Sequence, residues 1–198
     1  VSVAEVQTGL RSRAPHVRRA AARIGGQEEL FDLFPIFLRT SVTDPLHAVR
    51  EGAAFAASQI DTHDSRQFWT LTLARGKKPQ RLQAAENLGR YGGQLARQSL
   101  LVVLAAHDRT RPGHFRFGER QLQAVRDESQ TLMTGGLDGG TADREVIDQT
   151  STFKVTLLDD EITQAILAAL VELTGGPAGR PPEAWLYEYL EETKPDES

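Results

Sequence analysis

One pattern recurs along the first half of the chain and limits what the chain can fold into. Each copy begins near a proline and continues with an apolar residue beside an arginine, then an alanine pair. It ends with a large apolar residue near a glycine or another small residue. The anchoring alanines Ala21, Ala53 and Ala85 follow one another at intervals of 32 residues. A fixed period of this length predicts a repeat architecture, in which each unit buries its apolar face against its neighbours. The three copies are 15–26, 44–60 and 79–93.

Each copy has the features of one helix. Proline in a first turn costs no hydrogen bond, and Asp44 suits the N-cap of the second copy. The glycine pairs at 25–26 and 92–93 suit left-handed C-terminal caps. Apolar residues at helical spacing predict a buried stripe in each copy. The expected stripes are Val17, Ala20, Ala21 and Ile24 in the first copy, and Val49, Ala53, Ala56 and Ile60 in the second.

Other helical patterns lie between the copies. An apolar face at helical spacing is present in each of them, and Pro35 is expected to kink the first helix or to start its last part. The third is the most apolar and should be mostly buried. The alternation of these segments with the copies predicts helical pairs joined by short loops. The segments are 28–39, 65–74 and 94–107.

The repeat returns near the C-terminus. A fourth copy occupies 162–175, where Ile166 stands 81 residues after Ala85. The acidic residues just before it suit the N-terminus of a helix, because they favour the helix dipole. The segment 182–192 (PEAWLYEYLEE) predicts a short terminal helix, whose Trp185 should cap the open end of the core.

The repeat motifs also suggest a family. Val17-Arg18 and Val49-Arg50, the alanine pairs, and Asp44-Pro45 ahead of a Val-Arg helix together resemble HEAT-repeat proteins, within the wider armadillo-like α-solenoid group. The stretch 173–175 followed by PEAW is similar to the closing segment of many bacterial HEAT-like proteins. The third copy departs from the pattern, since Arg81-Leu82 stands where Val-Arg is expected, and its register is open by one residue.

The resemblance implies an all-α fold, an α–α superhelix (HEAT/armadillo-like solenoid) of about four helical pairs. It also implies a tendency to bind proteins or peptides, and no reaction. We expect a single HEAT-like domain over residues 1–192, with an irregular insertion at 108–160 and a frayed tail at 193–198. An ordinary, non-repetitive helical bundle with Ala-rich helices is the alternative fold.

The insertion carries two unusual runs. Segment 109–120 (RTRPGHFRFGER) interleaves basic and aromatic residues, and 151–158 alternates polar with apolar residues. Two interpretations stay open: the runs pair as a small β-ribbon across the solenoid, or the first run is an extended loop. The glycine-rich stretch 135–142 lacks the Lys-Ser/Thr of a phosphate loop and is interpreted as a linker.

Composition excludes several classes of protein. The chain has no cysteine, which excludes disulfides, thiolate metal sites and cysteine nucleophiles. Its longest apolar run, 100–106, is far shorter than the ~20 residues of a bilayer-spanning helix, so no membrane association is expected. No secretory signal is recognisable, which predicts a cytoplasmic protein. Because the chain begins with valine, we expect its native N-terminus to be missing.

No set of residues points to catalysis. The adjacent pair His63-Asp64 lacks the i, i+4 spacing of helical metal ligands and suits a helix end. We therefore predict no enzymatic activity, no cofactor and no metal. The candidate functional residues are instead polar positions on the concave face, which the second helix of each pair should line. They are Arg19, Arg23, Glu51, Glu86 and Arg90, with Arg116 in the 109–120 segment. Arg18, Arg50 and Arg81 are expected to form a structural ladder with residues such as Asp44.

Three functional hypotheses follow. The favoured one is a non-enzymatic, protein- or peptide-binding scaffold module, either by itself or as a segment of a larger protein. The sequence does not determine its oligomeric state. The second is a nucleic-acid-binding protein that uses the Arg-rich first repeats and segment 109–120. Residues 1–100 carry 14 basic and 9 acidic side chains, but residues 101–198 carry 9 and 18, and the sequence pI of about 5.8 does not favour this hypothesis. The third is a HEAT-like lyase or chaperone acting on a partner protein.

Overall fold

The computed structural model describes residues 1–108 and 160–192, and these residues are helical, with no strand among them. Nine α-helices and one 3₁₀-helix cover the described residues. The elements are α1 (Val3–Leu10), α2 (Pro15–Gln27), η1 (Phe31–Leu33), α3 (Phe34–Thr43), α4 (His47–Ile60), α5 (Thr62–Arg75), α6 (Lys78–Tyr91), α7 (Ala96–Asp108), α9 (Asp160–Thr174) and α10 (Pro182–Glu192).

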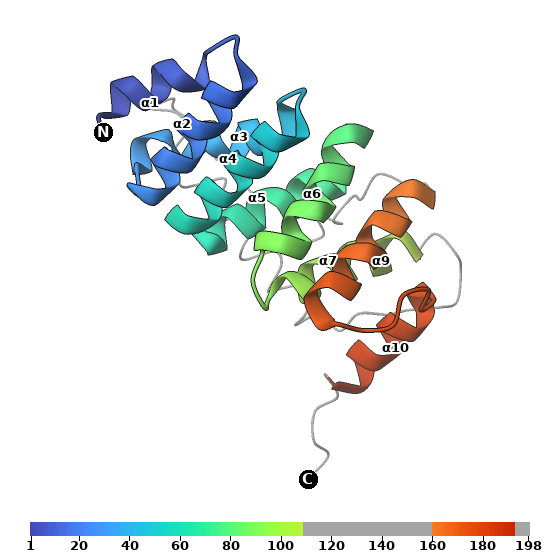
Figure 1. The fold of residues 1–198 in the computed structure, drawn as a ribbon. Coiled ribbons are helices and arrows are strands. Elements are labelled where there is room, and N and C mark those ends of the chain that lie inside the picture. The colour runs from blue at the N-terminus through green and yellow to red at the C-terminus, as the bar shows by residue number, and fades with distance from the viewer. Residues whose placement is uncertain (109–159, 193–198) are drawn as a thin grey trace, which may run out of the picture.

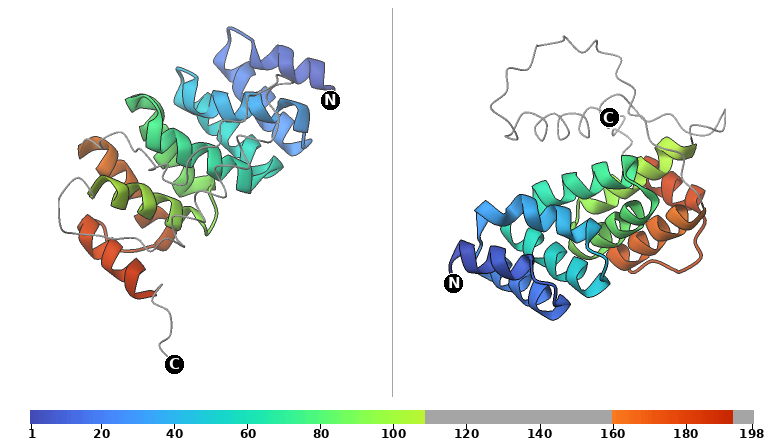
Figure 2. Two further views of the ribbon diagram at one scale, coloured as in Figure 1. Left: turned by 180° about the vertical axis from the view of Figure 1, so that it is seen from behind. Right: turned by 90° about the horizontal axis from the view of Figure 1, so that it is seen from above.

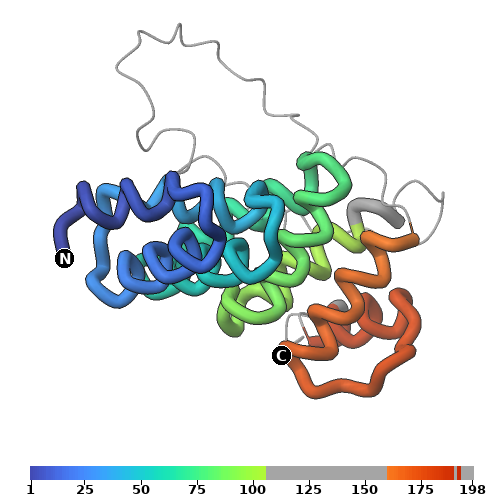
Figure 3. The backbone as a smooth tube through the Cα atoms, turned by 45° about the horizontal axis from the view of Figure 1, so that its top comes forward, coloured from blue at the N-terminus to red at the C-terminus, as the bar shows by residue number. Residues whose placement is uncertain are grey.

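The helices lie in two rows (Figures 1 and 2). The first row is α2, α4, α6 and α9, and each of these helices contacts the next. The second row is α1, α3, α5 and α7, and each of these packs most extensively against one helix of the first row: α1 on α2, α3 on α4, α5 on α6 and α7 on α9. Helix α10 packs against α7, so α1 and α10 lie at opposite ends of the molecule (Figure 3).

Small residues hold the first row together where its helices cross. A Cβ added at Gly26 of α2 would lie 2.5 Å from the Cα of Ala56 in α4. A Cβ added at Gly89 of α6 would lie 3.0 Å from the Cα of Ala169 in α9. Both distances are shorter than a van der Waals contact between carbon atoms, so a side chain at Gly26 would force the helices apart, and one at Gly89 would require a smaller shift. The same kind of contact therefore recurs at the α2–α4 and α6–α9 crossings.

The predicted buried stripe is largely confirmed in α4, where only Ile60 is half-buried, and largely wrong in α2, where Ala21 alone of the four residues is buried. In α4, Val49, Ala53 and Ala56 are fully buried. In α2, Val17 is 36% exposed and Ile24 is 37% exposed. Helix α2 packs on its neighbours with its smallest residues, Ala21, Ala22, Gly25 and Gly26. Ala21 lies against Gly9 of α1, Gly25 against Phe37 of α3 and Gly26 against Ala56 of α4, and this packing leaves Val17 and Ile24 partly exposed.

Two of the expected helix ends also differ. The pair 25–26 lies inside α2, and the left-handed residue that follows this helix is Glu29, with φ 49°. At the end of α6 the expectation is confirmed, since Gly93 has φ 69°. Asp44 is not the N-cap of α4, because that helix begins two residues later than expected, after Leu46. The Asp44 carboxylate instead accepts a hydrogen bond from the Leu46 amide at 3.0 Å.

Large side chains fill the space between the two rows. Trp69 of α5 is fully buried, and its indole nitrogen donates to the hydroxyl of Ser41 at 3.0 Å. Helix α3 begins at Phe34 with a proline in its first turn, so Pro35 starts the helix after the short 3₁₀ segment and does not kink it. Trp185 of α10 is 1% exposed and closes the C-terminal end of the core, which confirms its expected place.

The arginine ladder predicted between the copies is present. The Arg18 guanidinium donates to both carboxylate oxygens of Asp44, through Nε at 2.9 Å and Nη2 at 3.1 Å. Arg50 donates to the Asp44 carbonyl oxygen at 2.8 Å, and buried Arg81 donates to that of Leu73 at 2.7 Å. Arg18 thereby ties α2 to the loop before α4, whereas Arg50 and Arg81 tie α4 and α6 to the segments that precede them, and these contacts help to orient the first row.

The expectations for the insertion fall largely outside the described residues. These include the β-ribbon, the glycine-rich linker and the proposed contacts of Arg116. Within residues 1–108 and 160–192, no helix combines the length and apolar character needed to cross a membrane.

Candidate partner-binding surface

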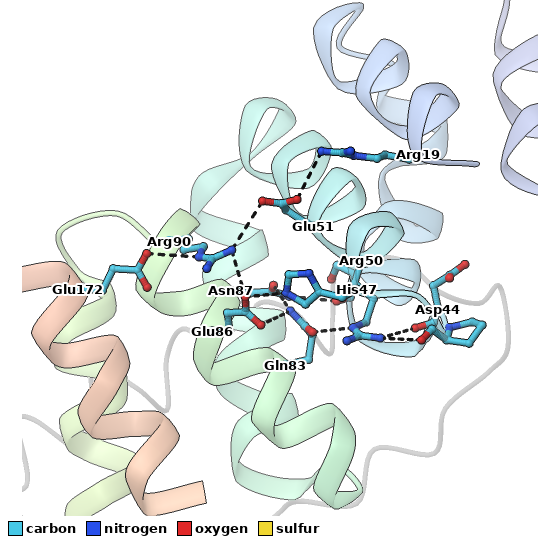
Figure 4. A network of polar contacts seen from close by, with 12 residues as sticks. Arg19, Asp44, His47, Arg50, Glu51, Gln83, Glu86, Asn87, Arg90 and Glu172 are labelled. Atoms are coloured by element: carbon cyan, nitrogen blue, oxygen red, sulfur yellow. Dashed lines mark hydrogen bonds and ion pairs between the residues drawn. The ribbon is translucent and has the colours of Figure 1, made fainter. Parts of the chain in front are cut away.

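The first row brings four of the candidate residues into one chain of ion pairs (Figure 4). Arg19 of α2 pairs with Glu51 of α4 at 3.6 Å, and Glu51 pairs with Arg90 of α6 at 3.6 Å. Arg90 also pairs with Glu86, one turn earlier on α6, at 3.1 Å. We call Arg19, Glu51, Glu86, Arg90 and the residue Glu172 described below the ion-pair row.

Glu172 extends the ion-pair row to α9 and was not predicted from the sequence. Its carboxylate accepts from the Nε of Arg90 at 3.3 Å. It stands there because Ala169, three residues earlier on α9, packs on Gly89, the residue before Arg90. The sequence signal for this contact was the pair of small residues Ala169 and Gly89. This pair predicts the place of Glu172 only when α6 and α9 are known to cross there.

The ion-pair row is partly open to solvent. Its side chains are between 30% and 48% exposed, with Glu86 the least and Glu172 the most exposed. Partial burial disfavours the charged form of Arg90, but the nearby carboxylates of Glu86 and Glu172 outweigh that effect and raise its pKa. Exposed pairs of this kind contribute about 0–1 kcal/mol each, so their partners can be exchanged at little cost.

An aromatic cluster borders the ion-pair row. The Arg23 guanidinium lies 5.7 Å from the centre of the Phe55 ring, a cation–π contact. The Phe55 ring meets Tyr91 edge-on, with ring centres 6.5 Å apart. Burial and the nearby Glu51 carboxylate both raise the pKa of Tyr91. Arg23 and Phe55 each stand four residues after a member of the ion-pair row, Arg19 and Glu51, so both follow it on the same helix face.

The buried side-chain amides of Gln83 and Asn87 form hydrogen bonds beneath the ion-pair row. Gln83 accepts from the Nε of Arg50 at 2.6 Å and donates to Glu86 at 3.1 Å and to Asn87 at 3.0 Å. Asn87 in turn donates to the carbonyl oxygen of Ser41 at 3.2 Å. This network links the arginine ladder to Glu86 and limits the rotamers of the Glu86 side chain, as Figure 4 shows.

His47 is a second member of this region that was not predicted. Its Nε2 lies 2.8 Å from the Glu86 carboxylate, and its side chain is 51% exposed. Both groups sit at the edge of the ion-pair row on α4 and α6. The His47 ring therefore adds a polar, hydrogen-bonding group beside Glu86.

Among the residues that the structure describes, one small group could hold a metal ion by geometry, namely Asp61, His63 and Asp64. The Asp61 carboxylate already caps α5 by accepting from the Asp64 amide at 2.9 Å. His63 and Asp64 contact each other at 3.2 Å at the same helix end. These contacts agree with the helix-end interpretation of this pair.

No family model matches the chain, and neither a curated protein nor a solved structure matches it. The function of the protein is therefore inferred from the geometry of this surface. Of the six candidate residues, the structure brings Arg19, Arg23, Glu51, Glu86 and Arg90 onto the first row of helices. Arg116 lies outside the described residues.

Proposed function

We propose that the protein is a HEAT-like solenoid that acts as a non-enzymatic scaffold module and binds an extended peptide segment of a partner protein along α2, α4, α6 and α9. The single observation that carries this proposal is the ion-pair row with its aromatic border. It offers partly exposed arginine, glutamate and aromatic side chains from successive helices on one face.

The packing supports the solenoid part of the proposal. The period of 32 residues in the sequence corresponds to successive helices of the first row. The Gly26–Ala56 and Gly89–Ala169 crossings repeat one packing solution at both ends of that row. A non-repetitive bundle has no reason to repeat a crossing in this way. Stacked units of this kind characteristically present an extended binding surface.

The dimensions of the surface suit a short extended segment. Neighbouring packed helices lie about 8–10 Å apart, so four helices in a row span about 27 Å. An extended chain advances about 3.3 Å per residue, so about eight residues would cross the row. Arginine and aromatic side chains are the types most enriched at protein interfaces, and Arg23, Phe55 and Tyr91 supply them here.

The alternating charge of the ion-pair row favours a peptide over a nucleic acid. Arg19 and Arg90 each have a glutamate beside them, and Glu51 stands between the two. A polyanion would be repelled by Glu51, Glu86 and Glu172, whereas a peptide with both signs of charge can pair with both. Nucleic-acid binding and the lyase or chaperone role stay predictions that no contact of the described residues favours.

Affinity capture tests the proposal. The tagged protein should retain a discrete protein from a lysate of its source cells at moderate salt and after nuclease treatment. Arg23→Glu, which removes the cation–π contact and reverses a charge on the surface, should reduce that capture. Arg39→Glu, at an exposed position on α3 in the second row, is the matched control and should leave it unchanged. Capture that disappears with nuclease would support nucleic-acid binding instead.

A further inference from the structure

Helix α2 carries a partly exposed apolar stripe on the face that is buried in the next helix of the first row, α4. Val17 and Ile24 are 36% and 37% exposed. The positions one period later are Val49 and Ala56 in α4, and both are fully buried. In α4 this face packs against α2, as the contact between Gly26 and Ala56 shows. The equivalent face of α2 is therefore of the kind that receives another helix.

The stripe lies on the side of α2 turned away from α4, where Val17 also borders Gly9 of α1. Gly26 faces α4, and Val17 stands nine residues before it, about 180° away around the helix. Ile24 is about 160° from Gly26 by the same count. Helix α2 is the first member of its row in Figure 1, and its extensive contacts are with α1 and α4. The stripe consequently lies at the N-terminal end of the row, on the opposite side of α2 from the α4 contact.

The charges around the stripe make it complementary to itself. Arg13 precedes the first turn of α2, and Glu28 caps its last turn; both side chains are exposed. If two α2 helices pack antiparallel with Val17 opposite Ile24, the start of one helix meets the end of the other, which brings Arg13 of one copy near Glu28 of the other. Ala20, which is exposed between the two apolar residues, then lies next to the two-fold axis, where a small side chain lets the helices approach closely.

We propose that a second copy of this chain covers the stripe, through an antiparallel, two-fold symmetric contact between the two α2 helices. The contact buries Val17 and Ile24 of both copies and forms two Arg13–Glu28 pairs. It leaves the ion-pair row uncovered, because Arg19 and Arg23 lie on other sides of α2. The proposal does not depend on the peptide-binding function. A helical repeat unit or an unrelated protein at this place would leave the isolated chain monomeric.

Sedimentation velocity over a concentration series tests the proposal. The 198-residue chain of 21.8 kDa should associate reversibly to a species of about 44 kDa. Ile24→Lys should keep it monomeric with an unchanged far-UV circular dichroism spectrum, because Ile24 is already partly exposed. Leu95→Lys, at a 55% exposed leucine between α6 and α7, is the matched control and should leave association unchanged. A wild-type chain that stays monomeric throughout, or equal effects of the two variants, would overturn the proposal.

A charge exchange tests the register. Arg13→Glu alone and Glu28→Arg alone should each raise the dimer dissociation constant about tenfold, because each sets like charges opposite one another twice. The double variant should return the dissociation constant to within about threefold of the wild-type value, since the pairs are restored with reversed sign. A double variant as weak as the single ones would overturn the antiparallel register.

Cysteine cross-linking gives a second readout of the same contact. The chain has no cysteine, so Ala20→Cys introduces a single thiol close to the proposed axis. Mild oxidation should link two copies of this variant through a disulfide, which requires the two Cα atoms to lie within about 7 Å. Ala48→Cys, exposed on α4, should not form the link. Equal cross-linking of the two variants would contradict the proposed contact.

Discussion

Replacement of Gly26 by alanine should destabilise the protein although it improves helix propensity. The added Cβ would lie 2.5 Å from the Cα and 2.8 Å from the Cβ of Ala56, so α2 and α4 must move apart. Carbon atoms pack best at about 3.5–4.0 Å, and a required shift of about 1 Å involves backbone that a rotamer change cannot relieve. Overpacking of this severity costs about 3 kcal/mol, and the gain in helix propensity returns about 1 kcal/mol. We expect a net loss of about 2 kcal/mol in the free energy of unfolding.

Gly52→Ala is the matched control, because Gly52 is also a buried glycine inside a helix of the first row. Its added Cβ would meet Arg19, with the Cγ and the carbonyl oxygen both at 3.3 Å, and a shift of a few tenths of an ångström suffices. We therefore expect a free energy of unfolding close to that of the wild type. Urea unfolding followed by far-UV circular dichroism measures both variants. If Gly26→Ala proves as stable as the wild type or more stable, the close α2–α4 crossing described here is wrong.

The remaining predictions concern three other contacts. Asp44→Ala should reduce the free energy of unfolding by about 1–3 kcal/mol, because it removes both carboxylate oxygens that accept from the partly buried Arg18; urea unfolding measures this, and no change would show that this ion pair contributes nothing. The hydrogen bond from Arg97 lowers the pKa of Glu192, so this contact should stabilise the fold above the ordinary glutamate pKa and lose its effect as the pH falls through the lowered value. Glu192→Gln should accordingly flatten the pH dependence of stability on the acid side, and an unaltered profile would contradict that assignment. Trp185→Ala should cost about 3–5 kcal/mol, because it opens the C-terminal end of the core; thermal unfolding tests it, and a loss below 1 kcal/mol would place Trp185 outside the core.

The sequence predicts most of the helices because their signals are local, although α1 was not predicted and α3 occupies 34–43 and not the expected 28–39. Pro15, Pro35 and Pro182 each stand in the first turn of a helix, and the Ala-rich repeats give the period that the first row follows. The terminal helix was predicted with its observed bounds. These features depend on backbone geometry and on residues within one turn of each other, which a single sequence contains.

The errors in α2 have a different origin. Apolar spacing predicts which stripe suits burial, but not whether another helix is present to bury it. Val17 and Ile24 follow the pattern of Val49 and Ala56, yet they belong to the first helix of the row and have no preceding one among the described residues. The glycines of α2 were interpreted by their conformational freedom, whereas the structure uses their lack of a side chain for close packing.

The candidate surface was predictable where its residues lie within the repeats. Arg19, Glu51, Glu86 and Arg90 lie on helices whose order the repeat fixes, and the structure joins them. Glu172 belongs to the helix after the insertion, where the period is broken, so its place beside Arg90 depends on a long-range crossing. That kind of contact cannot be derived from one sequence without the packing of α6 on α9.

The affinity of a selected peptide tests the central claim most directly. Peptides selected from a random display library against the immobilised protein are to be titrated calorimetrically into the wild type, Arg23→Glu and Arg39→Glu. If the surface along α2, α4, α6 and α9 binds extended segments, Arg23→Glu should weaken binding about tenfold or more, while Arg39→Glu should bind as the wild type does. Equal affinity for all three proteins would contradict the account, because binding would then occur elsewhere on the molecule.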